Sequence, residues 1–372
     1  MRPILRPVLR IVLGFAAALV ALLPLAAPRA QDVVHVYNWT DYISGDVVRA
    51  FEAETGIRVV YDVYDSNEVL EAKLLAGRSG YDLIFPSARP FATNHIAAGL
   101  YAALDFSALP NRRHLDPAVM ADLAQADPGN AHLVPYLWGS TGLGINEQAV
   151  RAALGPDAPL DTWALLFDPD NARRLAQCGI ALLDDEQEGH AAALFYLGRN
   201  PNSGAPEDLA AAQQALAAIR PYVRYFHSSK YLADLAGGEV CIALGYSGDI
   251  LQARARAQET SQPFTVRYVI PREGALRAVD VAAIPADAPH PRAAHRLLDY
   301  LMRPESAAAI TNAVAYPNAN TAATALVDPV LRDDPGIYPP PAVAARLVSA
   351  ATLDPAATRA RLRAWQRLKA GR

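Results

Sequence analysis

The sequence predicts an α/β protein in which a parallel β-sheet is flanked by helices. Between residues 33 and 87, short runs of β-branched and aromatic residues alternate with amphipathic stretches, as is typical of parallel strands joined by helical crossovers. The composition supports large buried cores, since 52% of the 372 residues are hydrophobic and 19% are charged. A chain of this length is expected to form two domains.

The first strands and helices follow from residue type and from helix-ending signals. Ser44 is expected to cap a helix whose apolar face carries Val47 and Phe51 and which ends at Gly56. Runs of β-branched and aromatic residues predict the neighbouring strands. In chain order, we expect a strand at 33–37, this helix, a strand at 57–63, a helix at 68–76 and a strand at 81–86.

The rest of the chain is expected to mix strands and helices without an internal repeat or a low-complexity linker. Residues 135–141 interrupt the early alternation, and residues 142–146 follow as an extended segment. Residues 331–341 are rich in proline and are expected to be irregular. Further strands are expected at 180–183, 241–245, 266–270 and 279–284, and further helices at 292–302, 304–313 and 357–369.

Residues 1–30 have the layout of a cleavable secretory signal peptide. Arg2, Arg6 and Arg10 precede an apolar run at 11–27, and small residues follow it, with cleavage expected near Ala30. An uncleaved membrane anchor is the alternative, but a run of this length that contains a proline is short for a span of about 20 residues. The sequence therefore predicts an exported protein.

Charge and cysteine usage agree with export. The net charge of −4 argues against nucleic-acid binding, and removal of residues 1–30 lowers it to −8, which suits a cationic partner. Cys178 and Cys241 are the two cysteines. In an oxidising compartment they are most simply one disulfide, and two buried free thiols are the alternative.

Motifs for catalysis, metals and cofactors are absent from the sequence. The eight histidines show no HExxH pattern and no paired cysteines beside them, so we expect them to be structural or surface residues. There is no Gly-x-Ser-x-Gly nucleophile elbow and no Walker motif. We therefore expect neither an enzyme nor a bound metal or cofactor. A ferric-ion site built from some of the 16 tyrosines is a lesser alternative.

Acidic residues stand beside aromatic ones where predicted strands end. Residues 39–42 (Trp-Thr-Asp-Tyr) and 246–249 (Tyr-Ser-Gly-Asp) are two such groups, Asp280 is a third position, and 184–188 is a short acidic cluster. Carboxylates and aromatic faces together suit an ammonium ligand, through charge-assisted hydrogen bonds and cation–π contacts. Helix caps and turns are the alternative explanation for each acid taken alone.

Nine segments, in order along the chain, form a distinctive set: 36–43 (VYNWTDYI), 51–57 (FEAETGI), 65–71 (DSNEVLE), 81–87 (YDLIFPS), 135–138 (PYLW), 200–203 (NPNS), 224–229 (RYFHSS), 316–320 (YPNAN) and 335–340 (PGIYPP). Together they resemble the polyamine-binding periplasmic receptors of ABC importers, and most closely their putrescine-binding branch. The resemblance covers essentially the whole chain after residue 30.

The resemblance implies a two-lobed, hinged periplasmic binding protein of type II, in which each lobe has a mostly parallel sheet flanked by helices. The first lobe would comprise residues 31–141 plus about 278–324, and the second about 142–277 plus 325–372. Such a receptor, expected to be monomeric, closes on a linear diamine and delivers it to an inner-membrane ABC permease. Tracts near 139–142 and Gly274 are the expected hinges.

The resemblance also implies a set of ligand-binding residues and supports the disulfide between Cys178 and Cys241. The ligand would lie between aromatic walls, with carboxylates at both of its ends. The implied residues are Trp39, Tyr246 and Tyr316 as aromatic walls, Asp41, Glu188, Asp249 and Asp280 as carboxylates, and Thr40 and Ser87 as polar groups.

Four positions near the implied site depart from the family pattern. Tyr246 stands where the putrescine branch usually has Trp, and Ser247 where the family has Ala. Ala278 replaces an aromatic ring, which removes up to about 2 kcal/mol of cation–π contact. Arg277 adds a cation, but on an extended segment it faces away from Ala278. The preferred amine is therefore left open.

Other functions remain as alternatives at this point. A sensory or regulatory receptor would use the same fold and the same cleft, as would a receptor for another cationic solute. A periplasmic glycosidase with paired carboxylates is a further alternative, but no motif favours it.

Overall fold

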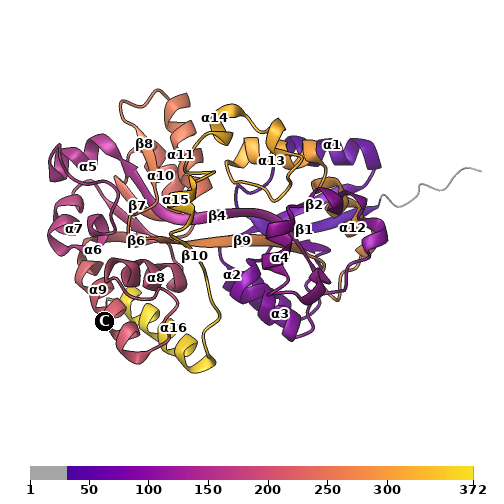
Figure 1. Cartoon of the computed structure of the whole chain (residues 1–372), viewed down its shortest axis with the longest axis horizontal. Coiled ribbons are helices and arrows are strands. Elements are labelled where there is room, and N and C mark those ends of the chain that lie inside the picture. Colours follow the sequence, from indigo (N-terminus) through magenta and orange to yellow (C-terminus); the bar gives the residue numbers. More distant parts are fainter. Residues whose placement is uncertain (1–31, 372) are drawn as a thin grey trace, which may run out of the picture. The chain divides into compact units, whose positions relative to one another are not determined.

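The computed structural model describes residues 32–371, so the expected signal peptide at 1–30 lies outside the described residues. Two long strands, β4 (Leu133–Asn146) and β9 (Ala275–Ala283), cross the centre of the molecule (Figure 1). They pair antiparallel and connect the elements on either side into one ten-stranded mixed sheet. The part of the chain that the structure describes contains no helix that is long and apolar enough to span a membrane.

The predicted parallel arrangement is confirmed at the amino-terminal side of the sheet. Strand β1 (Val33–Trp39) pairs in parallel with β2 (Arg58–Tyr64) and with β3 (Leu83–Ile84). Helices α1 (Gly45–Thr55) and α2 (Asn67–Leu75) are the crossovers. The α1 helix ends at Gly56, which adopts a left-handed conformation with φ of 71°.

Strand β3 is shorter than the predicted strand at 81–86. The reason lies at Phe85, whose carbonyl oxygen turns out of the ladder. It accepts hydrogen bonds from the Trp39 indole at 2.7 Å and from the Tyr64 hydroxyl at 2.5 Å. Side chains of the cleft described below therefore end this strand early.

The central strand β4 is longer than expected, because residues 135–141 belong to the same strand as 142–146. A register shift between Pro135 and Leu137 absorbs the proline, which cannot donate a ladder hydrogen bond. Strand β9 likewise begins at Ala275, four residues before the predicted run. A further short strand, β10 (Leu347–Ser349), pairs in parallel with β9 and was not expected from the sequence.

The other side of the sheet has the order β4-β7-β5-β6. Strand β5 pairs in parallel with both β6 and β7, whereas β7 and β8 run antiparallel to β4. The strands predicted at 180–183, 241–245 and 266–270 are confirmed within a residue or two. The three confirmed strands are β5 (Ile180–Leu182), β7 (Ile242–Tyr246) and β8 (Val266–Val269), and β6 (Val223–Phe226) was not expected from the sequence.

The helices predicted near the carboxyl terminus are confirmed, and the proline-rich segment 331–341 is irregular apart from single helical turns at its ends. The remaining α-helices are α3 (Thr93–Ala97), α4 (Pro117–Leu123), α5 (Glu147–Leu154), α6 (Ala164–Phe167), α7 (Pro169–Leu175), α8 (Glu186–Tyr196), α9 (Pro206–Ile219), α10 (Lys230–Gly237), α11 (Ser247–Glu259), α12 (Pro291–Leu301), α13 (Pro304–Val314), α14 (Pro329–Arg332), α15 (Pro341–Ala344) and α16 (Pro355–Lys369). Shorter helical turns lie at Ala88–Ala92, Phe106–Ala108, Pro110–His114, Pro128–Asn130, Arg220–Tyr222 and Thr324–Leu326.

Helices and strands gather on the two sides of the crossing strands (Figure 1), and the buried side chains of each side form hydrophobic cores of their own. One side, which we call the first lobe, is built around Phe51 and Phe85 and includes β1, β2, β3, α12 and α13. The other side, the second lobe, is built around Trp163 and Tyr231. Helix α16 packs on α8 and α9 and adds Trp365 to the second core. The fold is therefore two-lobed, and the exact lobe boundaries remain a prediction.

The disulfide between Cys178 and Cys241 is present, with a distance of 5.4 Å between the two Cα atoms. Cys178 follows α7, and Cys241 directly precedes β7. The bond therefore ties a peripheral helix of the second lobe to a central strand.

Candidate functional site

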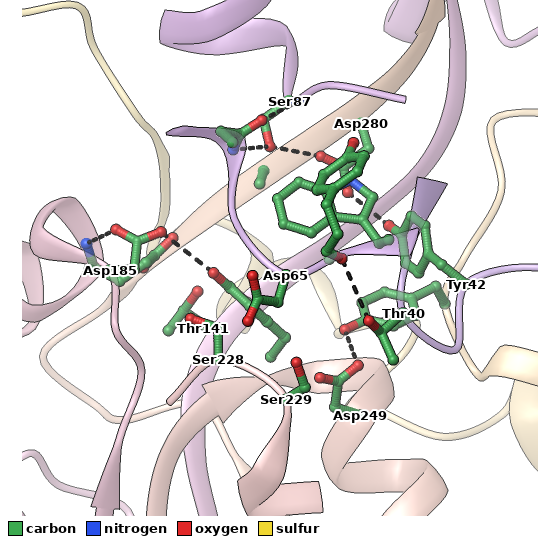
Figure 2. A pocket seen from close by; sticks show the side chains of 18 of the residues that line it. Thr40, Tyr42, Asp65, Ser87, Thr141, Asp185, Ser228, Ser229, Asp249 and Asp280 are labelled. Atoms are coloured by element: carbon green, nitrogen blue, oxygen red, sulfur yellow. Dashed lines mark hydrogen bonds between the residues drawn. The ribbon is translucent and has the colours of Figure 1, made fainter. Parts of the chain in front are cut away.

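A cavity of about 950 Å³, open solvent included, lies where the two lobes face each other. Residues of both lobes and of the crossing strands line it, and Figure 2 shows its polar side chains pointing inward. All nine residues that the sequence analysis singled out as ligand-binding line this cavity. They are Trp39, Thr40, Asp41, Ser87, Glu188, Tyr246, Asp249, Asp280 and Tyr316.

Asp280 is held at one end of the cleft by two hydroxyl groups. It lies on β9, where Ser87 donates a hydrogen bond of 2.7 Å to one carboxylate oxygen and Tyr42 donates one of 2.7 Å to the other (Figure 2). Asn67 in turn orients Ser87, because its side-chain amide exchanges hydrogen bonds of 3.1 Å with the backbone and hydroxyl of Ser87. Burial raises the pKa of Asp280 to about 6, although both hydroxyl hydrogen bonds oppose the shift.

Asp249 occupies a similar environment in the second lobe. It lies in the first turn of α11 and accepts hydrogen bonds from Tyr231 at 2.7 Å and from Tyr316 at 2.8 Å. Burial raises the pKa of Asp249 to about 6, again against the effect of the two hydroxyl donors. Both residues line the cavity, and a carboxylate oxygen that accepts one hydrogen bond can accept another from a ligand there.

Two more carboxylates, those of Asp185 and Glu188, lie at the amino-terminal end of α8. Asp185 caps this helix by accepting hydrogen bonds from the backbone nitrogens of Gln187 at 2.9 Å and Glu188 at 3.0 Å. The Tyr246 hydroxyl donates to its other oxygen at 3.3 Å. Burial raises the pKa of both acids, and the proximity of Asp185 contributes to the shift of Glu188 to about 8.

Asp41 differs from the other predicted carboxylates. Its side chain is exposed at the rim of the cavity, and its backbone adopts a positive φ of 55°. The carboxylate lies 3.5 Å from the guanidinium of Arg256 on α11, so it already has a cationic partner. Asp41 therefore links the two lobes at the rim.

Aromatic rings form the walls between these carboxylates. The Trp39 ring packs at 4.7 Å, centroid to centroid, on Tyr64, which the sequence analysis did not select. Tyr316 packs edge-on against Tyr42 at 4.8 Å. Thr40 donates a hydrogen bond of 3.3 Å to the carbonyl oxygen of Tyr64, which anchors the loop after β1.

The alternation predicted for Arg277 and Ala278 is confirmed. Ala278 lines the cavity, whereas the Arg277 guanidinium lies 4.0 Å from Asp122 outside it. Arg89 also lines the cavity, but its guanidinium lies 3.3 Å from Asp122 and donates to the Asp122 carbonyl oxygen.

Sequence reasoning missed several polar residues that line the cleft. Asp185 belongs to the acidic cluster at 184–188 but reads as an ordinary helix cap, and Tyr42 belongs to the loop at 39–42 but was not singled out. No local signal marks the others. The missed polar residues include Tyr42, Tyr64, Asp65, Asn67, Thr141, Asp185, Gln187, Ser228 and Ser229.

The charge of the cleft is the property that limits what it can bind. Within residues 32–371, no arginine, lysine or histidine forms an ion pair with Asp185, Glu188, Asp249 or Asp280, which we call the cleft carboxylates. An acidic group that is withdrawn from water without a counter-charge is unfavourable. The site is therefore chemically suited to a small ligand that supplies positive charge and hydrogen-bond donors.

A two-lobed α/β fold with a polar cleft between its lobes defines the class of extracellular solute-binding proteins. The family model for bacterial extracellular solute-binding proteins matches residues 46–339. The chain belongs to this family.

Characterised relatives extend over nearly the whole chain. The putrescine-binding periplasmic protein SpuD of Pseudomonas aeruginosa (strain UCBPP-PA14) is 51% identical over 340 residues, which cover 91% of this chain and 92% of SpuD. The putrescine-binding periplasmic protein PotF of Escherichia coli (strain K12) is 46% identical over 358 residues, 96% of each chain. A solved structure of a putative spermidine/putrescine ABC transporter from Listeria monocytogenes is 29% identical with a TM-score of 0.81, covering 92% of this chain and 100% of that one.

Proposed function

We propose that this protein is a periplasmic receptor that binds putrescine or a related polyamine in the cleft and delivers it to an inner-membrane ABC permease. The observation that carries the proposal is the set of cleft carboxylates, which have no cationic partner within residues 32–371. They come from both lobes and line one cavity with aromatic walls. The names of the relatives SpuD and PotF support the same ligand class.

A linear diamine matches the distribution of charge in the cleft. One ammonium group would bind at Asp280, where Ser87 and Tyr42 orient the carboxylate. The other end would meet the acids of the second lobe, Asp249 and Glu188. Ammonium groups donate charge-assisted hydrogen bonds to such carboxylates, and the methylene chain between them would pack on the rings of Trp39 and Tyr316.

Binding to both lobes provides the means of closure. A ligand favours the closed form only through contacts that the open form lacks, and Asp280 and Asp249 would supply such contacts from opposite sides. A shift from 1:99 to 99:1 in favour of the closed form requires about 5.5 kcal/mol of differential affinity. The expected hinge is the crossing of β4 and β9, near the glycines at 139–142.

The proposal includes binding without turnover and a monomeric receptor in the periplasm after removal of residues 1–30. The preferred amine depends on two features of the cavity wall. Ala278 leaves space beside the ligand chain, and Asp185 adds a carboxylate to those that the sequence analysis selected. Both features would raise the affinity for amines that are longer or more highly charged than putrescine, so that such amines would compete with putrescine for the cleft.

Isothermal titration calorimetry on the mature protein, refolded to remove endogenous ligand, tests the proposal. Putrescine, cadaverine, spermidine, spermine and agmatine would be titrated in turn, with a neutral diol as the control. We expect saturable binding of one amine per chain, lost in Asp249→Ala and in Asp280→Ala. Absence of heat with every amine, or equal binding of the diol, would overturn the assignment.

A further inference from the structure

A cluster of metal-ligating side chains lies outside the cleft. It consists of His35 on β1, Asp82 directly before β3 and His290 directly before α12. The potential ligand atoms of all three lie within 4.8 Å of one another. None of the three residues lines the cavity, which is formed at the carboxyl ends of β1 and β3, whereas this cluster lies toward their amino ends.

The spacing of the ligand atoms fits a single zinc ion. One carboxylate oxygen of Asp82, Oδ2, lies 3.3 Å from Nδ1 of His35 and 3.1 Å from Nδ1 of His290. Ligands that surround zinc tetrahedrally at about 2.0–2.1 Å lie about 3.3–3.4 Å from one another. The Asp82 oxygen thus already lies near tetrahedral spacing from each Nδ1 atom. The ligand atoms of the two imidazole rings lie within 4.8 Å of each other, and the rings would turn toward each other to share one ion.

The Asp82 carboxylate is held in place independently of the two imidazole rings. The backbone nitrogen of His35 donates to Oδ2 at 2.8 Å, and the backbone nitrogen of His290 donates to Oδ1 at 2.5 Å. Such supporting hydrogen bonds orient metal ligands and are typical of metal sites. The Asp82 side chain is 0% exposed, while the rings of His35 and His290 are 31% and 41% exposed. Solvent therefore reaches the open side of the cluster.

We propose that His35, Asp82 and His290 bind Zn²⁺, with water in the fourth position. Two imidazole nitrogens and one carboxylate oxygen are the donors that zinc takes, whereas Mg²⁺ and Ca²⁺ prefer oxygen ligands alone. Coordination through Nδ1 requires the neutral imidazole that carries its proton on Nε2. The ring proton that faces Asp82 would therefore transfer through solvent from Nδ1 to Nε2, and only a ring protonated on both nitrogens would release a proton. The ion would join His35 on β1 to His290 at the start of α12, 255 residues later in the chain, and would stabilise the first lobe.

Calorimetric titration of zinc chloride into the mature, untagged protein tests this site after treatment with a chelator and dialysis. We expect one zinc ion per chain in the wild type. In His290→Ala and in His35→Ala, the affinity for zinc should fall by about tenfold or more. His295→Ala is the matched control, because His295 lies on the same helix and its imidazole instead contacts Asp105 and Pro291. Zinc should raise the melting temperature of the wild type and the control but not that of His290→Ala.

Absence of binding at millimolar zinc would overturn the proposal, as would binding of one ion that His290→Ala leaves unchanged. Amine titrations on the same samples separate this site from the cleft, since the cluster does not line the cavity. If His290→Ala also loses amine binding, His290→Gln replaces it because glutamine keeps a bulky polar side chain there. Anomalous diffraction from zinc-soaked wild-type crystals is a further test. An anomalous peak between the three side chains supports the zinc site, and its absence overturns the proposal.

Discussion

The Tyr316 hydroxyl donates a hydrogen bond of 2.8 Å to Asp249, and this bond joins the core of the first lobe to a helix of the second. The Tyr316 ring lies directly on Gly248, the residue before Asp249, so closely that a Cβ atom at Gly248 would lie 2.1 Å from the ring. A second link between the lobes is the ion pair of Asp41 with Arg256 on the same helix. The contact between Tyr316 and Asp249 therefore couples the shape of the cleft to a carboxylate that is proposed to bind ligand.

Replacement of Tyr316 by phenylalanine should weaken putrescine binding by about tenfold or more. The change keeps the ring but removes a hydrogen bond to a charged group, which is worth about 1.5–3 kcal/mol. Calorimetric titration measures the effect. Tyr338→Phe is the control, since Tyr338 does not line the cavity. Equal affinity in both variants would contradict a role of the Tyr316 hydroxyl in binding.

Gly248→Ala should abolish most of the binding and lower the stability of the protein. The added methyl group overlaps the Tyr316 ring, so either the ring or α11 has to move. Gly237→Ala is a matched control near the end of α10, where an added Cβ has no atom within 4 Å. We expect normal binding and unchanged or slightly higher stability for the control. Urea unfolding measures stability, and calorimetry measures binding. Wild-type stability and wild-type affinity in Gly248→Ala would contradict the close packing of Tyr316 on Gly248.

Asp280→Asn and Asp41→Asn should differ sharply in their effects on amine affinity. Asp280 has no cationic partner in the cleft, so loss of its charge should weaken binding by about 10–100-fold. Asp41 is exposed and already paired with Arg256, and loss of such a surface pair should change affinity by about fivefold at most. The two variants control for each other in one titration series. An effect of Asp41→Asn as large as that of Asp280→Asn would place the ligand at the rim instead.

Amine affinity should rise as the pH increases from 5 to 8, with release of protons on binding. Burial raises the pKa of Asp249 and Asp280 to about 6 and that of Glu188 to about 8, so these groups are partly protonated in the free protein. An ammonium ligand requires their ionised forms. Calorimetry at one pH in buffers of different ionisation enthalpy counts the released protons, and a count of zero would contradict the prediction.

The same three groups should make the ligand-free protein less stable as the pH rises. Their pKa values are higher in the folded chain than the ordinary values of 3.8 for Asp and 4.5 for Glu, so the folded state binds more protons than the unfolded state. Their contribution to stability is complete below about pH 4 and is lost as the pH passes through about 6 and then about 8. Unfolding in urea across this range measures the trend, and saturating putrescine should oppose it. Asp280→Asn should show a weaker dependence.

Loss of the disulfide should lower the free energy of unfolding by about 2–4 kcal/mol and leave amine binding intact. Cys178 and Cys241 are 63 residues apart in the chain, and neither lines the cavity. The double variant Cys178→Ser with Cys241→Ser, or the wild type in reductant, can be unfolded in urea and titrated with putrescine. Weakened binding in a variant that remains folded would show that the bond shapes the cleft.

Much of the fold could be predicted because local rules govern single elements. β-Branched runs predicted β1 and β2, and Gly56 marked the end of α1. The exceptions occur where residues distant in the sequence change which backbone groups form the hydrogen bonds between strands. Strand β3 is cut short because Phe85 turns its carbonyl oxygen to Trp39 and Tyr64, and β10 forms only through its pairing with β9.

The candidate site was predicted only in part, because a local sequence pattern does not show which distant groups a side chain meets. Asp185 reads as a helix cap in the sequence, and it does cap α8, but its second oxygen also faces the cleft beside Tyr246. One carboxylate can serve both roles because its two oxygens accept separately, and a local pattern reports only the first role.

The sequence by itself determined the fold class, most strands and helices, and nine of the residues that line the cleft, because periodicity, caps and family motifs act within short segments. Tertiary structure alone decided which of these residues share an environment. Ser87 meets Asp280 across 193 residues of chain, Tyr316 meets Asp249, and His35 meets Asp82 and His290. Burial then set the pKa values of the acids, since the cost of a charge depends on how both lobes exclude water around it.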